Sequence, residues 1–168
     1  LCFTEKFKNT PHAYVKLWKH HAAQKEADDI NRLAKSTNAE WIKRYGGTIS
    51  CEWLFPKVLQ VLREAPEVYD RTFRFIEAGD WIVWMLTGKE SHSVCTTGFK
   101  ALWDEECGYP DSAFLKALHP SLENVAKTKI SNHVIKFSEN AGHITEHAEE
   151  KFGLKAGTPV SPAFIDAH

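Results

Sequence analysis

A carboxylate near the carboxyl end of the chain is the first group that could do chemistry. Asp166 follows residues 160–165, an apolar run with the composition of a short buried strand. A carboxylate just beyond such a strand faces the crevice at the carboxyl edge of a sheet, where it can accept a proton from a substrate hydroxyl. The alternative is that Asp166 caps a following helix. The pattern alone leaves both roles open.

Lys100 is the second candidate, because it follows small residues at 96–98. A turn of small residues brings the lysine's positive charge close to backbone and hydroxyl groups. A lysine there can hydrogen-bond a sugar hydroxyl or neutralise negative charge as a compact point charge. A solvated surface lysine has the same local pattern.

Glu52 is the third, since it follows the Gly46-Gly47 turn, is flanked by Trp53 and Phe55, and opens an expected helix. Its carboxylate suits either the positive end of a helix dipole or a polyol bound beside aromatic rings.

A zinc-peptidase pattern is also present. His143, Glu146 and His147 match the H-x-x-E-H spacing, in which two histidines share one helix face. Such a site needs a third protein ligand, and nine histidines in 168 residues make a chance match easy. We therefore expect no metal site here. The sequence also contains no P-loop and no G-x-G-x-x-G motif, so a nucleotide would need its phosphates held elsewhere.

The elements that must position these residues are mostly helical, with a few short strands between them, which indicates the α/β class. Asp80 is expected to cap a helix over 81–87, with Gly88 as its C-terminal glycine. Strands are expected at 13–18 and 160–165, and further helices at 21–35, 52–64, 66–69, 111–118 and 138–152.

Composition excludes several classes of protein. Hydrophobic residues make up 43% and charged residues 26%, a globular balance. Twenty-one basic and twenty-two acidic residues give a net charge of −1, which argues against a nucleic-acid partner. The longest apolar run, 81–86, is far shorter than the roughly 20 residues of a membrane span. Four cysteines without CxxC or zinc spacing are expected to be reduced thiols in a cytoplasmic protein.

The two ends of the chain are interpreted as cuts. The sequence begins at Leu1 with neither an initiator methionine nor a signal peptide, and it stops just after an apolar run. The chain is therefore expected to be a fragment.

Several motifs, in order along nearly the whole chain, resemble the FGGY carbohydrate kinases, and most closely the ribulose-phosphorylating branch of that family. The most specific are the run Val-Lys-Leu-Trp-Lys-His-His-Ala-Ala and the run Cys-Thr-Thr-Gly-Phe-Lys-Ala. The matching segments are 11–23, 44–47, 50–53, 78–81, 86–88, 95–103, 108–110, 122–124 and 165–168.

The resemblance implies an actin-like, ribonuclease H-like fold. Residues 1–168 would form the central and C-terminal part of the N-terminal, sugar-binding domain. The family's phosphate-binding turn would lie upstream, and its C-terminal ATP-binding domain downstream. The fragment alone is expected to be inactive, and a homodimer is left open.

The resemblance also implies roles. Asp166 matches the family's catalytic base, Lys100 a sugar-binding lysine, and Glu52, Trp18 and Lys19 lie where relatives contact or approach the sugar. The implied activity is phosphorylation of L-ribulose to L-ribulose 5-phosphate in arabinose catabolism, with ATP and Mg²⁺ bound mainly outside this chain. The alternatives are a kinase of D-ribulose, xylulose, ribitol or glycerol, or a non-catalytic sugar-binding relic.

Overall fold

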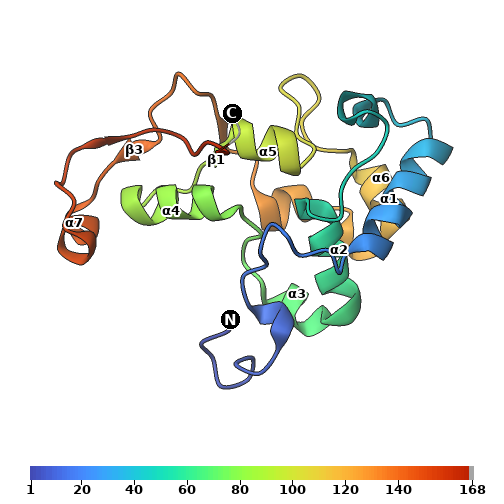
Figure 1. Ribbon diagram of the computed structural model, residues 1–168, viewed down its shortest axis with the longest axis horizontal. Helices are drawn as coiled ribbons and strands as arrows, with labels where there is room; N and C mark the ends of the chain where they lie inside the picture. The colour runs from blue at the N-terminus through green and yellow to red at the C-terminus, as the bar shows by residue number, and fades with distance from the viewer. Residues whose placement is uncertain (167–168) are drawn as a thin grey trace. The chain divides into compact units, whose positions relative to one another are not determined.

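The computed structural model describes residues 1–166 and divides into two compact units, which are described one at a time (Figure 1). Unit 1 comprises Leu1–Phe75 and Pro110–Val125, and unit 2 comprises Ile76–Tyr109 and the chain from Ala126 onward. Both contain helices, and unit 2 also contains short strands. The mixture agrees with the expected α/β class.

Unit 1 is built around helix α2 (Leu54–Glu64), which packs against α1 (Gln24–Ser36) and α3 (Pro66–Arg71). Helix α1 also contacts α6 (Ser112–Leu118), and the two lie side by side in Figure 1. Short 3₁₀ turns complete the unit: η1 (Pro11–Ala13), η2 (Glu40–Tyr45) and η3 (Pro120–Leu122). The best-buried side chains of its core are Ile30, Phe55, Val58, Leu59, Leu115 and Leu122.

Helix α2 forms because its apolar residues recur at helical spacing and Pro56 lies in the first turn, where its missing N–H leaves no hydrogen bond unmade. Phe55 and Leu59 are 2% and 0% exposed. Burying each side chain of that size contributes about 1.5–3 kcal/mol. One residue departs from the apolar pattern: Gln60 is 2% exposed although it is polar.

Unit 2 contains two small sheets. Strands β1 (His92–Ser93) and β2 (Val134–Ile135) pair in parallel, with His92 opposite Val134. Strands β3 (Gly142–His143) and β4 (Pro159–Val160) pair antiparallel, with Gly142 opposite Val160. Around them lie α4 (Ala78–Thr87), α5 (Val94–Lys100), the π-helical turn η4 (Ala126–Ile130) and α7 (Glu146–Phe152).

Strand β3 approaches α4 so closely that its first residue must be glycine. Gly142 has φ +144°, and a Cβ atom there would lie 2.9 Å from the Cβ of Thr87. Both the backbone conformation and the space therefore require the absence of a side chain.

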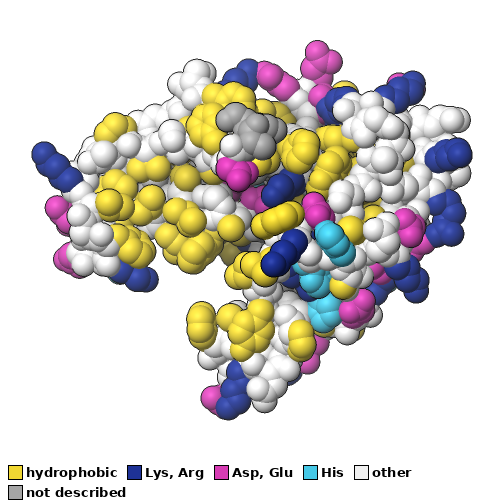
Figure 2. Space-filling model, in the orientation of Figure 1, with side chains coloured by type: hydrophobic (Ala, Val, Ile, Leu, Met, Phe, Trp, Pro, Cys, Tyr) yellow, Lys and Arg dark blue, Asp and Glu magenta, His cyan; other side chains and the backbone are white. Residues whose placement is uncertain are grey.

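Helix α4 is apolar on more than one face. Val83 is buried, whereas Trp81, Ile82 and Met85 are 49%, 51% and 38% exposed. Figure 2 shows hydrophobic side chains gathered over this part of the surface. Exposed apolar groups of this size are typical of surfaces that another part of a protein covers. Within residues 1–166, no helix combines the length and the hydropathy needed to cross a membrane.

Several helix predictions are confirmed, including the one over 111–118: α6 spans Ser112–Leu118, and its capping residue Asp111 accepts a hydrogen bond from the Phe114 N–H at 2.8 Å. Gly88 ends α4 in the left-handed conformation, as expected. The helix predicted over 138–152 is wrong in its first half, because that stretch contains β3 and α7 begins only at Glu146.

The strand predicted over 13–18 is absent: Ala13 ends η1, and residues 14–18 form no strand. The strand predicted over 160–165 is wrong in extent, because β4 ends at Val160, and Asp166 lies in a turn six residues later. The reason is pairing: residues 14–18 and 161–165 have no neighbouring strand among the described residues, and an alternating pattern needs a ladder partner to become a strand. Residues 167 and 168 lie outside the described part of the chain.

Candidate functional site

Helix α5 carries Lys100 at its C-terminal end. The helix is capped by Ser93, whose Oγ accepts the Cys95 N–H at 3.1 Å. The Lys100 Nζ lies 3.8 Å from Glu77 Oε2, and both side chains are 24% exposed. Lys100 is thus a half-buried, ion-paired amine and not a fully solvated one. Its place in the last turn of α5 also suits the negative end of the helix dipole.

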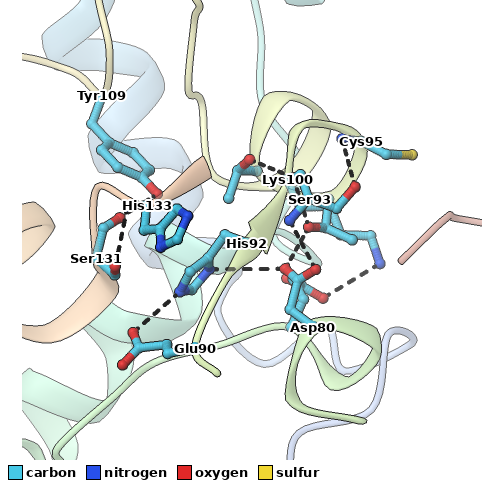
Figure 3. A network of polar contacts seen from close by, with 12 residues as sticks. Asp80, Glu90, His92, Ser93, Cys95, Lys100, Tyr109, Ser131 and His133 are labelled. Carbon is cyan, nitrogen blue, oxygen red and sulfur yellow. Dashed lines mark hydrogen bonds and ion pairs between the residues drawn. The ribbon is translucent and has the colours of Figure 1, made fainter. Parts of the chain in front are cut away.

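The start of α5 is fixed by a buried carboxylate, shown in Figure 3. Asp80 is 1% exposed and accepts hydrogen bonds from the Ser93 N–H at 3.0 Å and from the Thr96 hydroxyl at 2.6 Å. His92 Nδ1 lies 3.8 Å from the same carboxylate. Asp80 was expected to cap α4, but that helix begins at Ala78 after Glu77. The expectation was wrong because Asp80 lies inside the first turn of α4, where its side chain reaches α5.

Burial raises the pKa of Asp80 to about 6 from 3.8, against the hydrogen bonds from Thr96 and Ser93, which lower it. A pKa above the unfolded value means that the folded state binds the proton more tightly. The stabilising contribution of Asp80 is therefore complete below about pH 4 and is lost as the pH rises through about 6.

We expect the free energy required to open α5 to decrease as the pH rises from 4 to 7. The decrease should be larger in the wild type than in Asp80→Asn, by up to about 3 kcal/mol. The asparagine keeps an acceptor for the Ser93 N–H and does not titrate. Hydrogen exchange of the α5 amides in the intact protein, compared between the two proteins at each pH, measures this difference. A difference that stays constant over that range would contradict the raised pKa.

Asp166 is exposed and follows a segment that contacts α5. The Ile165 N–H points to the Sγ of Cys95 at 3.4 Å, and Cys95 is buried. Helix α5 therefore contacts the segment that carries Asp166 at its first turn and carries Lys100 in its last turn.

The three other predicted residues lie in unit 1. Trp18 and Lys19 are exposed, with Trp18 at 67%. Glu52 precedes α2 by two residues, and its Oε1 lies 2.7 Å from His21 Nε2. Glu52 is therefore engaged with the segment that carries Trp18 and Lys19. The helix-dipole alternative receives little support, because Glu52 lies outside the first turn.

A groove of about 500 Å³ in unit 1 is lined by Lys19, one of these residues, and by neighbouring side chains. Its floor is polar: Lys16 Nζ lies 3.0 Å from His12 Nδ1, and His12 Nε2 lies 2.9 Å from Glu64 Oε2. Burial lowers the pKa of Lys16, although Glu64 raises it. In Figure 2 a group of histidine side chains (cyan) lies among basic and acidic ones. The groove is lined by Pro11, His12, Val15, Lys16, Leu17, Lys19, His20, Ala22, Gln60 and Glu64.

The zinc-peptidase spacing has no helical counterpart. His143 lies on β3, whereas Glu146 and His147 begin α7 after the capping residue Thr145. The two histidines therefore do not share a helix face. Among residues 1–166, no three side chains of the His, Cys, Asp and Glu types lie together as metal ligands.

Sequence reasoning missed the residues that hold the candidates in place. Gln60 and Glu77 contact the predicted site segments but were not singled out, and Asp80 was given the wrong role. A detectable signal existed for Gln60, since it interrupts the apolar run of residues 58–62.

Comparisons with known proteins agree on one family. The profile of the FGGY family of carbohydrate kinases, N-terminal domain, matches residues 4–168. Proteins named ribulokinase from Bacillus licheniformis and Halalkalibacterium halodurans are each 46% identical over all 168 residues, and one from Staphylococcus aureus is 45% identical over 164. The chain spans about 30% of the length of each of these relatives.

Solved structures share the fold at lower identity. A xylulose kinase and a gluconate kinase, both from Lactobacillus acidophilus, superpose with TM-scores of 0.65 and 0.66 at 16% identity. Each match covers 88% of this chain and 28% of the other. The actin-like, ribonuclease H-like sugar-kinase fold expected from the sequence is thereby confirmed.

Proposed function

This chain belongs to the FGGY family of carbohydrate kinases, and we propose that it supplies the sugar-binding part of a kinase that transfers a phosphoryl group from ATP to ribulose. The identity of 46% to proteins named ribulokinase, over the whole chain, supports ribulose over other sugars. The observation that carries the proposal is that α5 ends in Lys100 and also contacts the segment bearing Asp166.

Asp166 acts as the base in this proposal. Its exposed carboxylate takes the proton from the sugar hydroxyl that attacks the terminal phosphorus of ATP. Lys100 donates hydrogen bonds to the sugar hydroxyls, and its ion pair with Glu77 directs the amine.

The unit 1 residues contribute binding and orientation. Trp18 offers a flat apolar surface to the carbon skeleton of the sugar, and Lys19 and Glu52 offer hydrogen bonds to its hydroxyls. Glu52 is shared with His21, so its hydrogen bonds to a sugar would compete with that contact.

ATP and Mg²⁺ are the proposed co-substrate and its counter-ion. Among residues 1–166, no three side chains of the His, Cys, Asp and Glu types lie together. We propose that the ion is held mainly by the phosphates of ATP and by protein groups outside this range.

The biological setting follows from the same proposal. The substrate would be L-ribulose, the product L-ribulose 5-phosphate, and the process arabinose catabolism in the cytoplasm. Residues 1–168 would be the central and C-terminal part of the sugar-binding domain.

The test is sugar-dependent release of ADP by the intact kinase that contains this chain, with L-ribulose, D-ribulose, xylulose, ribitol and glycerol compared side by side. We expect kcat/KM for a ribulose to exceed that for each other polyol by at least about tenfold, because cleft hydrogen bonds discriminate hydroxyl positions. Preference for another polyol would mean that ribulose is not the substrate, while the assignment of Asp166 as the base would stand. The absence of turnover with all five would leave a non-catalytic sugar-binding protein.

A further inference from the structure

One polar face of α2 contacts the segment that carries Trp18 and Lys19. Lys57, Gln60 and Glu64 are spaced at i, i+3 and i+7, so they lie on the same side of the helix. Lys57 Nζ donates to the backbone oxygen of Leu17 at 3.0 Å. The contact lies directly before Trp18.

Gln60 is the centre of this face. Its Oε1 lies 3.0 Å from His20 Nε2, and its Nε2 donates to Glu64 Oε1 at 3.2 Å. The amide orientation is fixed by its neighbours, because the reverse would bring the Gln60 oxygen against the Glu64 carboxylate. His20 therefore carries its proton on Nε2. Glu64 also contacts His12. The buried glutamine is therefore linked directly to His20 and, through Glu64, to His12, and these two histidines lie on opposite sides of Trp18 in the sequence.

Burial of apolar side chains does little to fix this segment. Between η1 and α1 it forms no helix or strand, and Val15, Leu17 and Trp18 are 85%, 60% and 67% exposed. Its position therefore depends on polar contacts, and those from α2 come from a buried, well-packed helix. Because Gln60 is only 2% exposed, its hydrogen bond to His20 is partly shielded from water, which strengthens it and raises the cost of breaking it.

We propose that Gln60 is a positioning residue that holds the Trp18–Lys19 turn in place for sugar binding, acting through His20. The inference rests on the proposed function, in which this turn binds the sugar. Gln60 touches neither the sugar nor ATP in this proposal. Its loss should therefore weaken sugar binding and leave the chemical step intact.

The experiment uses Gln60→Leu in the intact kinase, a change of similar volume that removes both hydrogen bonds. We expect KM for ribulose to rise about tenfold, with KM for ATP and kcat within about twofold. Gln24→Leu is the matched control, since the side chain of Gln24 is exposed on α1 and its amide donates a hydrogen bond to Asp28 in the same helix. It is expected to leave all three constants unchanged.

A second variant protects the test against misfolding of α2. His20→Leu breaks the same hydrogen bond from the less buried side and should give the same rise in KM. The double variant should be no worse than Gln60→Leu alone, because that single change has already removed the His20–Gln60 hydrogen bond. An unchanged KM for ribulose in both single variants, while Trp18→Ala raises it, would overturn the inference.

Hydrogen exchange over residues 14–21 separates this outcome from failure of the proposed function. If Trp18→Ala does not raise the KM for ribulose, the assigned role of Trp18 is wrong, and kinetics no longer report on Gln60. Faster exchange over 14–21 in Gln60→Leu, but not in Gln24→Leu, would still support the positioning role. Unchanged exchange would overturn it.

Discussion

Replacing Asp166 by asparagine in the intact kinase is expected to lower kcat with ribulose by at least about 10²-fold. The amide has the size of the carboxylate and can still accept a hydrogen bond from the sugar hydroxyl, but it cannot take the proton. The attacking oxygen then has to lose its proton to water. Coupled measurement of ADP release gives kcat, and calorimetric titration gives the affinity for ribulose, which we expect to stay within about threefold of the wild type.

Asp28→Asn provides the control for this change. Asp28 is exposed on α1, and its carboxylate accepts a hydrogen bond from the Gln24 amide in the same helix at 2.8 Å. The variant carries the same chemical replacement away from the proposed site and should keep wild-type kcat. If Asp166→Asn keeps kcat within about fivefold of the wild type, Asp166 is not the base, since proton transfer contributes more than that. The capping role would then remain for this residue.

The helices of unit 1 could be predicted because each carries its own local signal. Helix α2 has an apolar repeat with a proline in its first turn, and α6 has Asp111 as a cap. These signals act over a few residues and do not depend on contacts with distant parts of the chain. Asp80 shows the limit of such reasoning: its type suits a cap, but burial against α5 gave it a different partner.

The strands could not be placed in the same way, because a strand is defined by a neighbour that lies far away in sequence. β1 pairs with β2 across some forty residues, and the run 160–165 forms a ladder only over its first residue. Residues 13–18 alternate as a strand would, yet polar contacts from α2 hold them in an irregular path. Periodicity reports which side chains alternate and says nothing of whether a partner is present.

The candidate site could be predicted as residue types but not as an arrangement. Lys100 and Asp166 were identifiable from their segments, whereas the contact of Cys95 with Ile165, which relates them, joins residues seventy apart. The partner Glu77 carried no signal, because a glutamate before a helix has many ordinary uses, and Gln60 was marked only as a polar residue within the apolar run 58–62.

Replacing Lys100 by methionine is expected to raise KM for ribulose by about ten- to a hundredfold while KM for ATP changes by less than about threefold. Methionine keeps the apolar stem and removes the charged donor, so the loss reports on hydrogen bonds to the sugar hydroxyls. Steady-state kinetics with each substrate varied in turn measures both constants.

Removing Lys100 also removes its ion pair with Glu77, and this second effect has to be separated from the loss of sugar contacts. The double variant Lys100→Met, Glu77→Gln also removes the charge of Glu77, so any rise in KM that persists in it belongs to the sugar. Lys116→Met is the matched control, because it breaks an exposed lysine–glutamate pair at 3.1 Å, of the kind that contributes little. If the double variant regains the wild-type KM, the Lys100 amine serves only to neutralise Glu77. If the KM for ribulose stays as high in the double variant as in the single one, the Lys100 amine contacts the substrate.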